Sequence, residues 1–220
     1  MLYPNNNTFE TLSFWFGTGR VFSYDWTQLT DWIYLSHSAQ MKGQLGYGIT
    51  LFAEDEFYKN ILFEDNYGLE ISFEKSFSKS ISFNIKPKFG TEIIRVDAPY
   101  QARNTGLGLG IELKPSDEFK LNFRMDQSKS IRFENDEVVY SDMIARARFE
   151  YQATTFLNFR LVAQYHRYYD TFDIQPLVSY QPGPFSIFYF GTSRSYDTSF
   201  PGWKESYGQI YLKVQKLFSF

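Results

Sequence analysis

YGQIYLKVQKLFSF, residues Tyr207–Phe220, is the stretch that best indicates the fold of this chain. In an extended strand, successive side chains point to opposite faces of the sheet. One face of this stretch carries apolar side chains: Ile210, Leu212, Val214, Phe218 and Phe220. The other face carries mainly polar ones: Gln209, Tyr211, Lys213, Gln215 and Ser219. The stretch is therefore predicted to be a strand with one apolar and one polar side.

The same alternation recurs along the chain and predicts about twelve strands. We expect them at 8–20, 30–39, 43–55, 66–76, 80–96, 104–114, 118–132, 138–152, 155–168, 172–181, 184–196 and 207–220. The clearest is 138–152, where Ala145, Ala147 and Phe149 alternate with Arg146 and Arg148. No stretch of comparable length has a helical period. The chain is therefore predicted to be all-β and antiparallel.

Composition narrows the class of protein. The chain has 24 Phe, 17 Tyr and 4 Trp, so one residue in five is aromatic. The absence of cysteine excludes disulfides, thiolate metal sites and a cysteine nucleophile. The net charge of -3 and the lack of a basic run do not favour nucleic acid. No apolar run approaches the ~18–20 residues of a membrane helix. A mean hydropathy of -0.37 is compatible with a membrane barrel, whose inner face is polar.

The predicted connections fall into two groups. Short turns are expected at 40–43, 77–79, 115–117, 153–154 and 182–183. Longer segments are expected at 21–29, 57–65, 97–103, 133–137 and 197–206, and 169–171 is a brief exception. Short periplasmic turns opposite longer outer loops are typical of outer-membrane barrels.

Two soluble alternatives, a β-sandwich and a lipid-binding barrel, fit the pattern less well. Sandwich strands are usually near 5–6 residues, and several strands here exceed ten. A soluble lipid-binding barrel places its apolar residues inside and its charges outside, the reverse of a membrane barrel. The tyrosines favour the membrane barrel, because they lie on the apolar faces towards strand ends, where an interfacial aromatic girdle belongs. These tyrosines are Tyr47, Tyr67, Tyr151, Tyr165 and Tyr180. We therefore predict a single antiparallel transmembrane β-barrel domain over 1–220, located in a bacterial outer membrane.

Two resemblances extend this prediction. Tyr207–Phe220 resembles the terminal strand of bacterial outer-membrane barrels, which implies that it closes the barrel against 8–20 and carries the signal read by the insertion machinery. The segments LNFRLVAQY (157–165), DIQPLVSYQ (173–181) and PFSIFYFG (184–191), followed by Tyr196–Asp197, resemble the C-terminal barrel region of the Bacteroidetes DUF5916 family. Members of that family carry an N-terminal family-9-type carbohydrate-binding domain. The resemblance therefore implies a link to glycan handling.

The beginning of the given sequence shows neither the carbohydrate-binding domain of the family nor a signal peptide for export. No carbohydrate-binding domain precedes the predicted strands, so we expect either a short relative or the C-terminal part of a larger barrel. The first residues, MLYPNNNTFE, have neither the basic segment nor the apolar core of a signal peptide. An exported chain would then have its signal upstream.

Charged side chains on the predicted inner faces are the main candidate site. An acidic arc consists of Glu54, Glu70 and Glu74. A basic arc consists of Lys86, Lys88, Lys120, Arg124, Arg146, Arg148 and Arg160. These groups must face the lumen, because Arg or Lys facing lipid at the bilayer midplane costs about 2–4 kcal/mol. Either the arcs interlock as salt bridges and fill the barrel, or they leave a wet gap whose field favours anionic or zwitterionic solutes.

Other side chains support further hypotheses. His37, in the segment SHS, and His166 are the two histidines, but no GxSxG motif accompanies them. A barrel enzyme acting on lipid or lipopolysaccharide and a structural subunit of an envelope complex remain alternatives to a non-enzymatic transport role. Trp203 is the candidate for stacking on a sugar. No metal or cofactor is expected. The expected partners are outer-membrane lipid, lipopolysaccharide, the insertion machinery, and glycans or envelope proteins, without nucleic acid.

Overall fold

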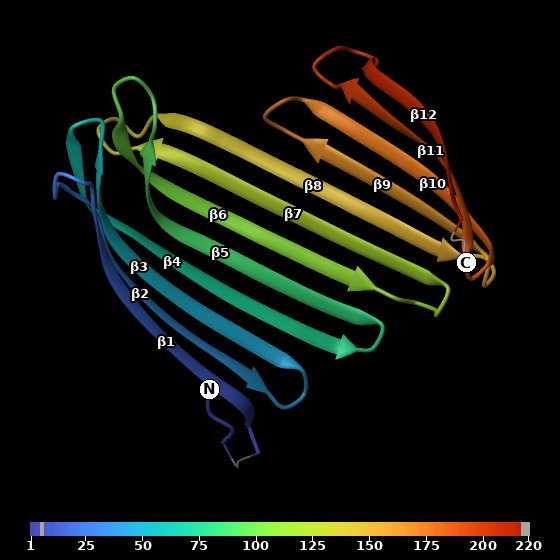
Figure 1. The fold of residues 1–220 in the computed structure, drawn as a ribbon, viewed down its shortest axis with the longest axis horizontal. Coiled ribbons are helices and arrows are strands. Elements are labelled where there is room, and N and C mark those ends of the chain that lie inside the picture. The colour runs from blue at the N-terminus through green and yellow to red at the C-terminus, as the bar shows by residue number, and fades with distance from the viewer. Residues whose placement is uncertain (5–6, 217–220) are drawn as a thin grey trace. The chain divides into compact units, whose positions relative to one another are not determined.

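The computed structural model describes residues 1–4 and 7–216. Twelve antiparallel strands form one sheet in sequence order, and neighbouring strands lie side by side in Figure 1. The strands are β1 (Phe9–Phe22), β2 (Gln28–Met41), β3 (Leu45–Tyr58), β4 (Ile61–Ser78), β5 (Ile81–Ile94), β6 (Tyr100–Leu113), β7 (Phe119–Arg132), β8 (Val138–Gln152), β9 (Leu157–His166), β10 (Thr171–Gly183), β11 (Ser186–Asp197) and β12 (Lys204–Lys216). The predicted all-β class and strand number are confirmed. Within the described residues, no helix has the length and hydrophobicity needed to cross a membrane.

The prediction of a loop at 57–65 is wrong. β3 and β4 continue as a paired hairpin to Lys59 and Asn60, whose φ angles of 49° and 63° form a tight hairpin turn. Asp65, with a φ of 57°, lies at a β-bulge where the register shifts between Glu54 and Glu56. The charged composition of this segment is typical of a loop, but cross-strand pairing keeps its backbone extended.

The predicted contrast between short turns and long loops is largely absent. One set of connections runs over 42–44, 79–80, 114–118, 153–156 and 184–185. The other set runs over 23–27, 59–60, 95–99, 133–137, 167–170 and 198–203. The two sets overlap in length, because strands such as β3 and β4 extend into residues that were predicted to be loop.

The chain divides into two compact units. Unit 1 comprises Met1–Phe77, Phe83–Leu109 and Gln127–Ser141, and unit 2 comprises Ser78–Ser82, Gly110–Asp126 and Asp142–Phe220. β1 to β3 therefore lie in unit 1, and β9 to β12 lie in unit 2. The single barrel domain predicted over 1–220 stays a prediction.

Register separates two faces in unit 1, because residues opposite each other on paired strands share a face. Leu51 of β3 lies opposite Leu35 of β2 and Leu69 of β4. Its neighbour Thr50 lies opposite Ser36 and Glu70. We call the side that carries Leu51 the apolar face and the side that carries Thr50 the polar face.

Unit 2 repeats the same two-faced arrangement. Phe149 of β8 lies opposite Leu161 of β9, which lies opposite Pro176 of β10. On the other face, Arg146 lies opposite Gln164, which lies opposite Asp173. The side with Phe149 is the apolar face of unit 2, and the side with Arg146 is its polar face.

The sheet has little buried apolar core. Among the described residues, the buried apolar side chains are Ala39, Phe63, Ala102 and Val162. By contrast, Leu51 is 47% exposed, and Leu212 of β12 is 71% exposed. A soluble two-layer protein would bury such side chains against a second layer. Here the apolar faces are left open.

Candidate functional site

The polar face of β1, β2 and β3 carries an aromatic hollow of about 590 Å³. Its lining includes Trp15, Trp32, Tyr34, Ser36, Phe52 and Glu54. Register brings these residues together from three strands: Trp15 lies opposite Ser36, Trp32 opposite Glu54, and Tyr34 opposite Phe52. The hollow therefore depends on pairing between strands that are separate in the sequence.

Glycines hold two of its rings in place. A Cβ atom at Gly19 would lie 2.7 Å from Cζ2 of Trp32, and one at Gly68 would lie 2.0 Å from Cε1 of Phe52. Each ring thus lies directly over backbone that has no side chain, as when aromatic residues cover strand glycines. The space that each glycine leaves on the polar face is occupied by a ring of the hollow, which is thereby fixed in orientation.

One carboxylate, that of Glu54, belongs to the lining. Among the described residues, no hydrogen-bond or ion-pair partner reaches it. The nearby Arg95 is engaged by Glu56, with two N···O distances of 2.7 and 2.8 Å, and it lies over the ring of Tyr58. No lysine or arginine of the described chain lines the hollow. Its local charge is therefore negative.

The other predicted acidic residues lie close to predicted basic ones. Glu70 forms an ion pair with Lys88 at 2.7 Å. Glu74 and Lys86 line a second, smaller hollow of about 250 Å³ on the polar face. In unit 1, members of the two arcs are therefore neighbours on adjacent strands, and the pairing that we observe is local.

In unit 2, most members of the basic arc also have nearby acids. Lys120 binds Glu112 at 2.9 Å, and the Arg124–Asp126 pair is longer, at 3.6 Å. Arg148 pairs with Glu150. These contacts neutralise cations on the same or an adjacent strand. That the arcs line a lumen stays a prediction.

Arg160 of β9 is a different case. It lies opposite Glu150 of β8 and Leu177 of β10 in the register. Its Nε atom is buried and has no hydrogen-bond partner within the described structure. A buried unpaired donor is costly, so this side chain is a constrained point in the polar face.

The contacts of His37 indicate a structural role. It lies on the apolar face, where Nδ1 is 3.1 Å from the carbonyl oxygen of Ser13 and Nε2 is 3.0 Å from the hydroxyl of Tyr47. Phe14 stacks on its ring at a centroid distance of 4.3 Å. Both ring nitrogens are thus occupied without a carboxylate. Ser36 lies on the opposite face, so this arrangement does not form a Ser–His–Asp site.

The structure also shows a contact of the second histidine, His166, that the sequence did not predict. Nε2 of His166 lies 2.7 Å from Oδ2 of buried Asp142. The same carboxylate accepts hydrogen bonds from the backbone N–H groups of Met143 and Tyr168. Asp142 thus anchors the connection 167–170 to β8. The alternation that places Asp142 and Arg146 on one face of β8 was the available signal, but the register with His166 was not.

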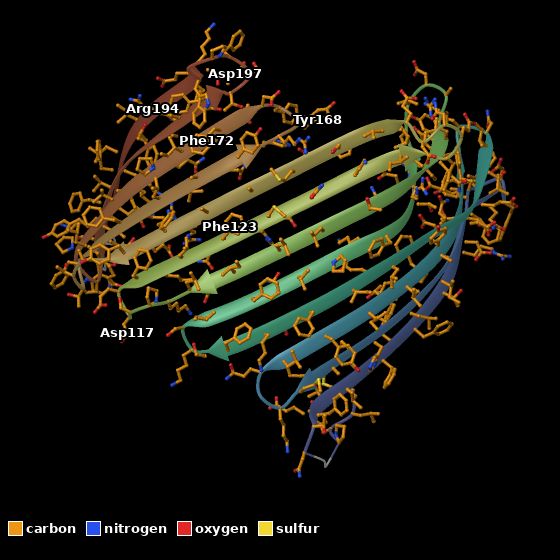
Figure 2. The ribbon with its side chains drawn as sticks, turned by 180° about the vertical axis from the view of Figure 1, so that it is seen from behind. Asp117, Phe123, Tyr168, Phe172, Arg194 and Asp197 are labelled. Atoms are coloured by element: carbon orange, nitrogen blue, oxygen red, sulfur yellow. The ribbon has the colours of Figure 1, made fainter. Side chains whose placement is uncertain are left out.

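Trp203, the predicted sugar-stacking residue, lies at the end of the connection 198–203. Its ring packs against Phe172, with centroids 5.0 Å apart. Figure 2 shows Phe172, Arg194 and Asp197 at one end of the strands of unit 2 and Asp117 at the other. Trp203 remains half exposed, and sugar stacking stays a prediction.

The predicted closing strand is β12, which pairs with β11. Three of its residues lie on the apolar face, with Ile210 opposite Thr192, Leu212 opposite Phe190, and Val214 opposite Phe188. The other two predicted closing residues, Phe218 and Phe220, lie outside the described residues. Closure against 8–20 stays a prediction.

Comparisons with known proteins give one structural likeness. No protein-family model matches the chain, and no curated protein matches it. The chain is similar to the "CymD monoaromatic hydrocarbon channel", with 12% sequence identity and a TM-score of 0.39, over 91% of this chain and 77% of that chain. At this TM-score the likeness does not assign a function. The resemblance to the DUF5916 family stays a prediction.

Proposed function

We propose that this chain is a non-enzymatic β-barrel of a bacterial outer membrane and that its polar faces line a lumen used for solute passage. The observation that carries the proposal is the exposed apolar face. In β3, Ile49 and Leu51 are exposed beside Leu35 of β2. Soluble monomers rarely expose contiguous apolar patches beyond a few hundred Å². A lipid bilayer makes such a face favourable.

Strand length and strand pairing also support a location in a lipid bilayer. Every strand has at least 10 residues, and a tilted strand needs about 9–11 to cross a bilayer. Antiparallel pairing on both sides satisfies the backbone N–H and C=O groups of β2 to β11, which have no water partner in hydrocarbon. The proposed closure of the barrel would do the same for β1 and β12.

The polar face supports the transport part of the proposal. The side chains of Lys88 and Glu70 form an ion pair and yet remain 57% and 41% exposed. Charged groups left open in this way require water beside them. A wet face opposite a lipid face is the arrangement of a membrane barrel with a conducting lumen.

The glycan and envelope part of the proposal has a separate basis. It rests on the DUF5916 resemblance and on the exposed Trp203 ring, since aromatic rings can stack on sugars. Lipopolysaccharide, glycans and the insertion machinery would be the partners of such a barrel. For the enzyme alternative, His37 offers no acid partner. His166 does contact Asp142, but that carboxylate also accepts the backbone N–H groups of Met143 and Tyr168 and so has a structural role.

The deciding experiment combines insertion with conductance. The purified chain, refolded into lipid vesicles, should show a heat-modifiable shift on gel electrophoresis and discrete conductance steps in planar bilayers. The double variant R146A/R148A should shift ion selectivity towards cations, because it removes two positive charges from the lumen. The control R194A should not, because Arg194 lies on the apolar side, opposite Gly208. Failure to insert would refute the barrel, and insertion without conductance would refute the pore.

A further inference from the structure

The four rings of the aromatic hollow form walls rather than a flat patch. Trp15 and Tyr34 meet edge to face, with centroids 5.0 Å apart and planes at 80°. Trp32 and Phe52 are fixed over Gly19 and Gly68. Aromatic faces carry negative electrostatic potential and attract cations, most strongly where Trp is present. The hollow therefore presents several cation-attracting faces within one space.

The charge of the lining favours the same kind of ligand. Glu54 contributes the only charged side chain of the lining among the described residues. The charged groups near it are Glu56 and Arg95, which neutralise each other in a two-bonded pair. The negative charge of Glu54 is thus left for a ligand. A neutral apolar ligand would desolvate this carboxylate without compensation.

Two other ligand classes fit less well. An anion would meet a carboxylate and no lysine or arginine. A sugar needs hydrogen-bond partners for several hydroxyl groups, but most of the lining surface is apolar. The polar atoms of the lining side chains are the Glu54 carboxylate, the hydroxyls of Ser36 and Tyr34 and two indole N–H groups, and the Ser36 hydroxyl lies 3.2 Å from that of Thr50. A cation with an apolar surface needs only the rings and the carboxylate, as in the aromatic cages that bind quaternary ammonium groups.

We propose that the aromatic hollow binds a small organic cation with a methylated ammonium group. Its volume of about 590 Å³ is within the range of small-ligand sites. The inference adds a solute class to the proposed function and rests on it for access to the hollow from the lumen. The carboxylate of Glu54 would balance the cation's charge, and Trp15, Trp32, Tyr34 and Phe52 would contact its methyl groups.

The test compares choline with 3,3-dimethylbutan-1-ol, a neutral molecule of the same shape. Binding is measured by tryptophan fluorescence and calorimetry on the folded chain in a maltoside detergent, because phosphocholine and betaine detergents carry the probe's own ammonium group. Choline should bind saturably and at least about tenfold more tightly than the neutral analogue.

Matched variants locate the site. E54Q and W15A should each weaken choline binding about tenfold, through loss of the charge and of one ring. E137Q, at an acid in the connection 133–137, and W26F, in the connection 23–27, should leave it unchanged. Trp15 is 58% exposed, so its truncation leaves the sheet intact, and the heat-modifiable gel shift verifies folding of every variant.

Several results would overturn the inference: equal binding of choline and its neutral analogue, no choline binding by the folded chain, or an E54Q affinity equal to that of the parent. These outcomes are separate from the test of the proposed function. A chain that inserts and conducts but ignores choline refutes only the cation site. A chain that binds choline in detergent but neither inserts nor conducts refutes the pore and retains the site.

Discussion

The two faces of β3 have similar exposure and opposite chemistry. On one face, Leu51 is 47% exposed between Leu35 and Leu69. On the other, Phe52 is 40% exposed, in a row that includes Thr50 and Glu54. Exposure alone does not distinguish the faces. A single sheet with exposed leucines on one side and exposed carboxylates on the other is suited to lipid on the first side and to water on the second.

One polar residue on each face, His37 and Glu54, shows a further difference in hydrogen bonding. On the apolar face, both ring nitrogens of His37 have partners, Ser13 and Tyr47. On the polar face, Glu54 has no ion-pair or hydrogen-bond partner among the described residues. An unsatisfied polar group costs several kcal/mol in hydrocarbon but little in water. At these two residues hydrogen bonding follows the same division as composition, whereas Glu70 on the polar face is paired with Lys88.

The largest effect should come from placing the same charge on each face in turn. L51R places a guanidinium among leucines near the middle of β3, and we expect it to reduce the free energy of unfolding by about 2–4 kcal/mol in a bilayer. The control T50R, one residue away on the polar face, should change it by less than about 1 kcal/mol. Denaturant unfolding from lipid vesicles measures both values. Equal costs would mean that the faces do not meet different solvents.

A smaller effect should follow from filling a glycine on the polar face. A Cβ at Gly90 would lie 2.2 Å from the backbone carbonyl oxygen of Tyr67, which cannot rotate away. G90A should therefore destabilise the fold by about 1–3 kcal/mol. At Gly183 a Cβ meets nothing within 4 Å, so G183A should be close to neutral. Unfolding midpoints of the two variants in the same detergent compare them, and a neutral G90A would contradict the close strand approach.

The ion pair Lys88–Glu70 tests whether the polar face is wet. Because both side chains are about half exposed, their coupling energy should not exceed about 1 kcal/mol and should fall further in 1 M salt. A double-mutant cycle of K88M and E70Q measures this coupling. A coupling well above this value, insensitive to salt, would place the pair away from water and would favour a filled lumen.

The smallest effect concerns the connection 23–27, which belongs to neither face. Hydrogen bonds from the hydroxyl groups of Ser23 and Thr27 and from the Thr27 N–H lower the pKa of the Asp25 carboxyl. Because the pKa is depressed, the ionised carboxylate stabilises the turn above the ordinary Asp pKa of about 3.9. This stabilisation is lost as the pH falls through the lower folded-state value.

Hydrogen exchange of the Thr27 amide measures this dependence. Protection should decrease on acidification in the parent chain, and D25N should show weak protection at every pH. An unchanged profile in D25N would mean that the carboxylate does not hold the turn.

Much of the fold could be predicted from local alternation. The predicted strand 138–152 coincides with β8, because its apolar and charged residues alternate without interruption. The segment 57–65 was missed because its charges are typical of a loop, while the tight turn at Lys59–Asn60 and the bulge at Asp65 keep it paired. Bulges and turns act through backbone geometry, for which polarity is a poor guide.

The candidate site was predicted less completely. The alternation located charges such as Glu54, Glu70 and Lys88, but it did not predict that Glu70 and Lys88 would pair. The aromatic hollow was missed altogether. Its rings come from three strands, and none of those strands contains the hollow by itself.

The strand number and the two-sided character of each strand follow from local alternation, because a period of two is a property of the extended backbone. Which residues lie opposite one another depends on how the strands pair. Trp32 meets Glu54, and Tyr34 meets Phe52, through a register that the hairpins set. A slip of one residue would turn a strand's side chains to the other face. The physical reason is that pairing joins residues distant in sequence, so the hollow and the ion pairs exist only in the assembled sheet.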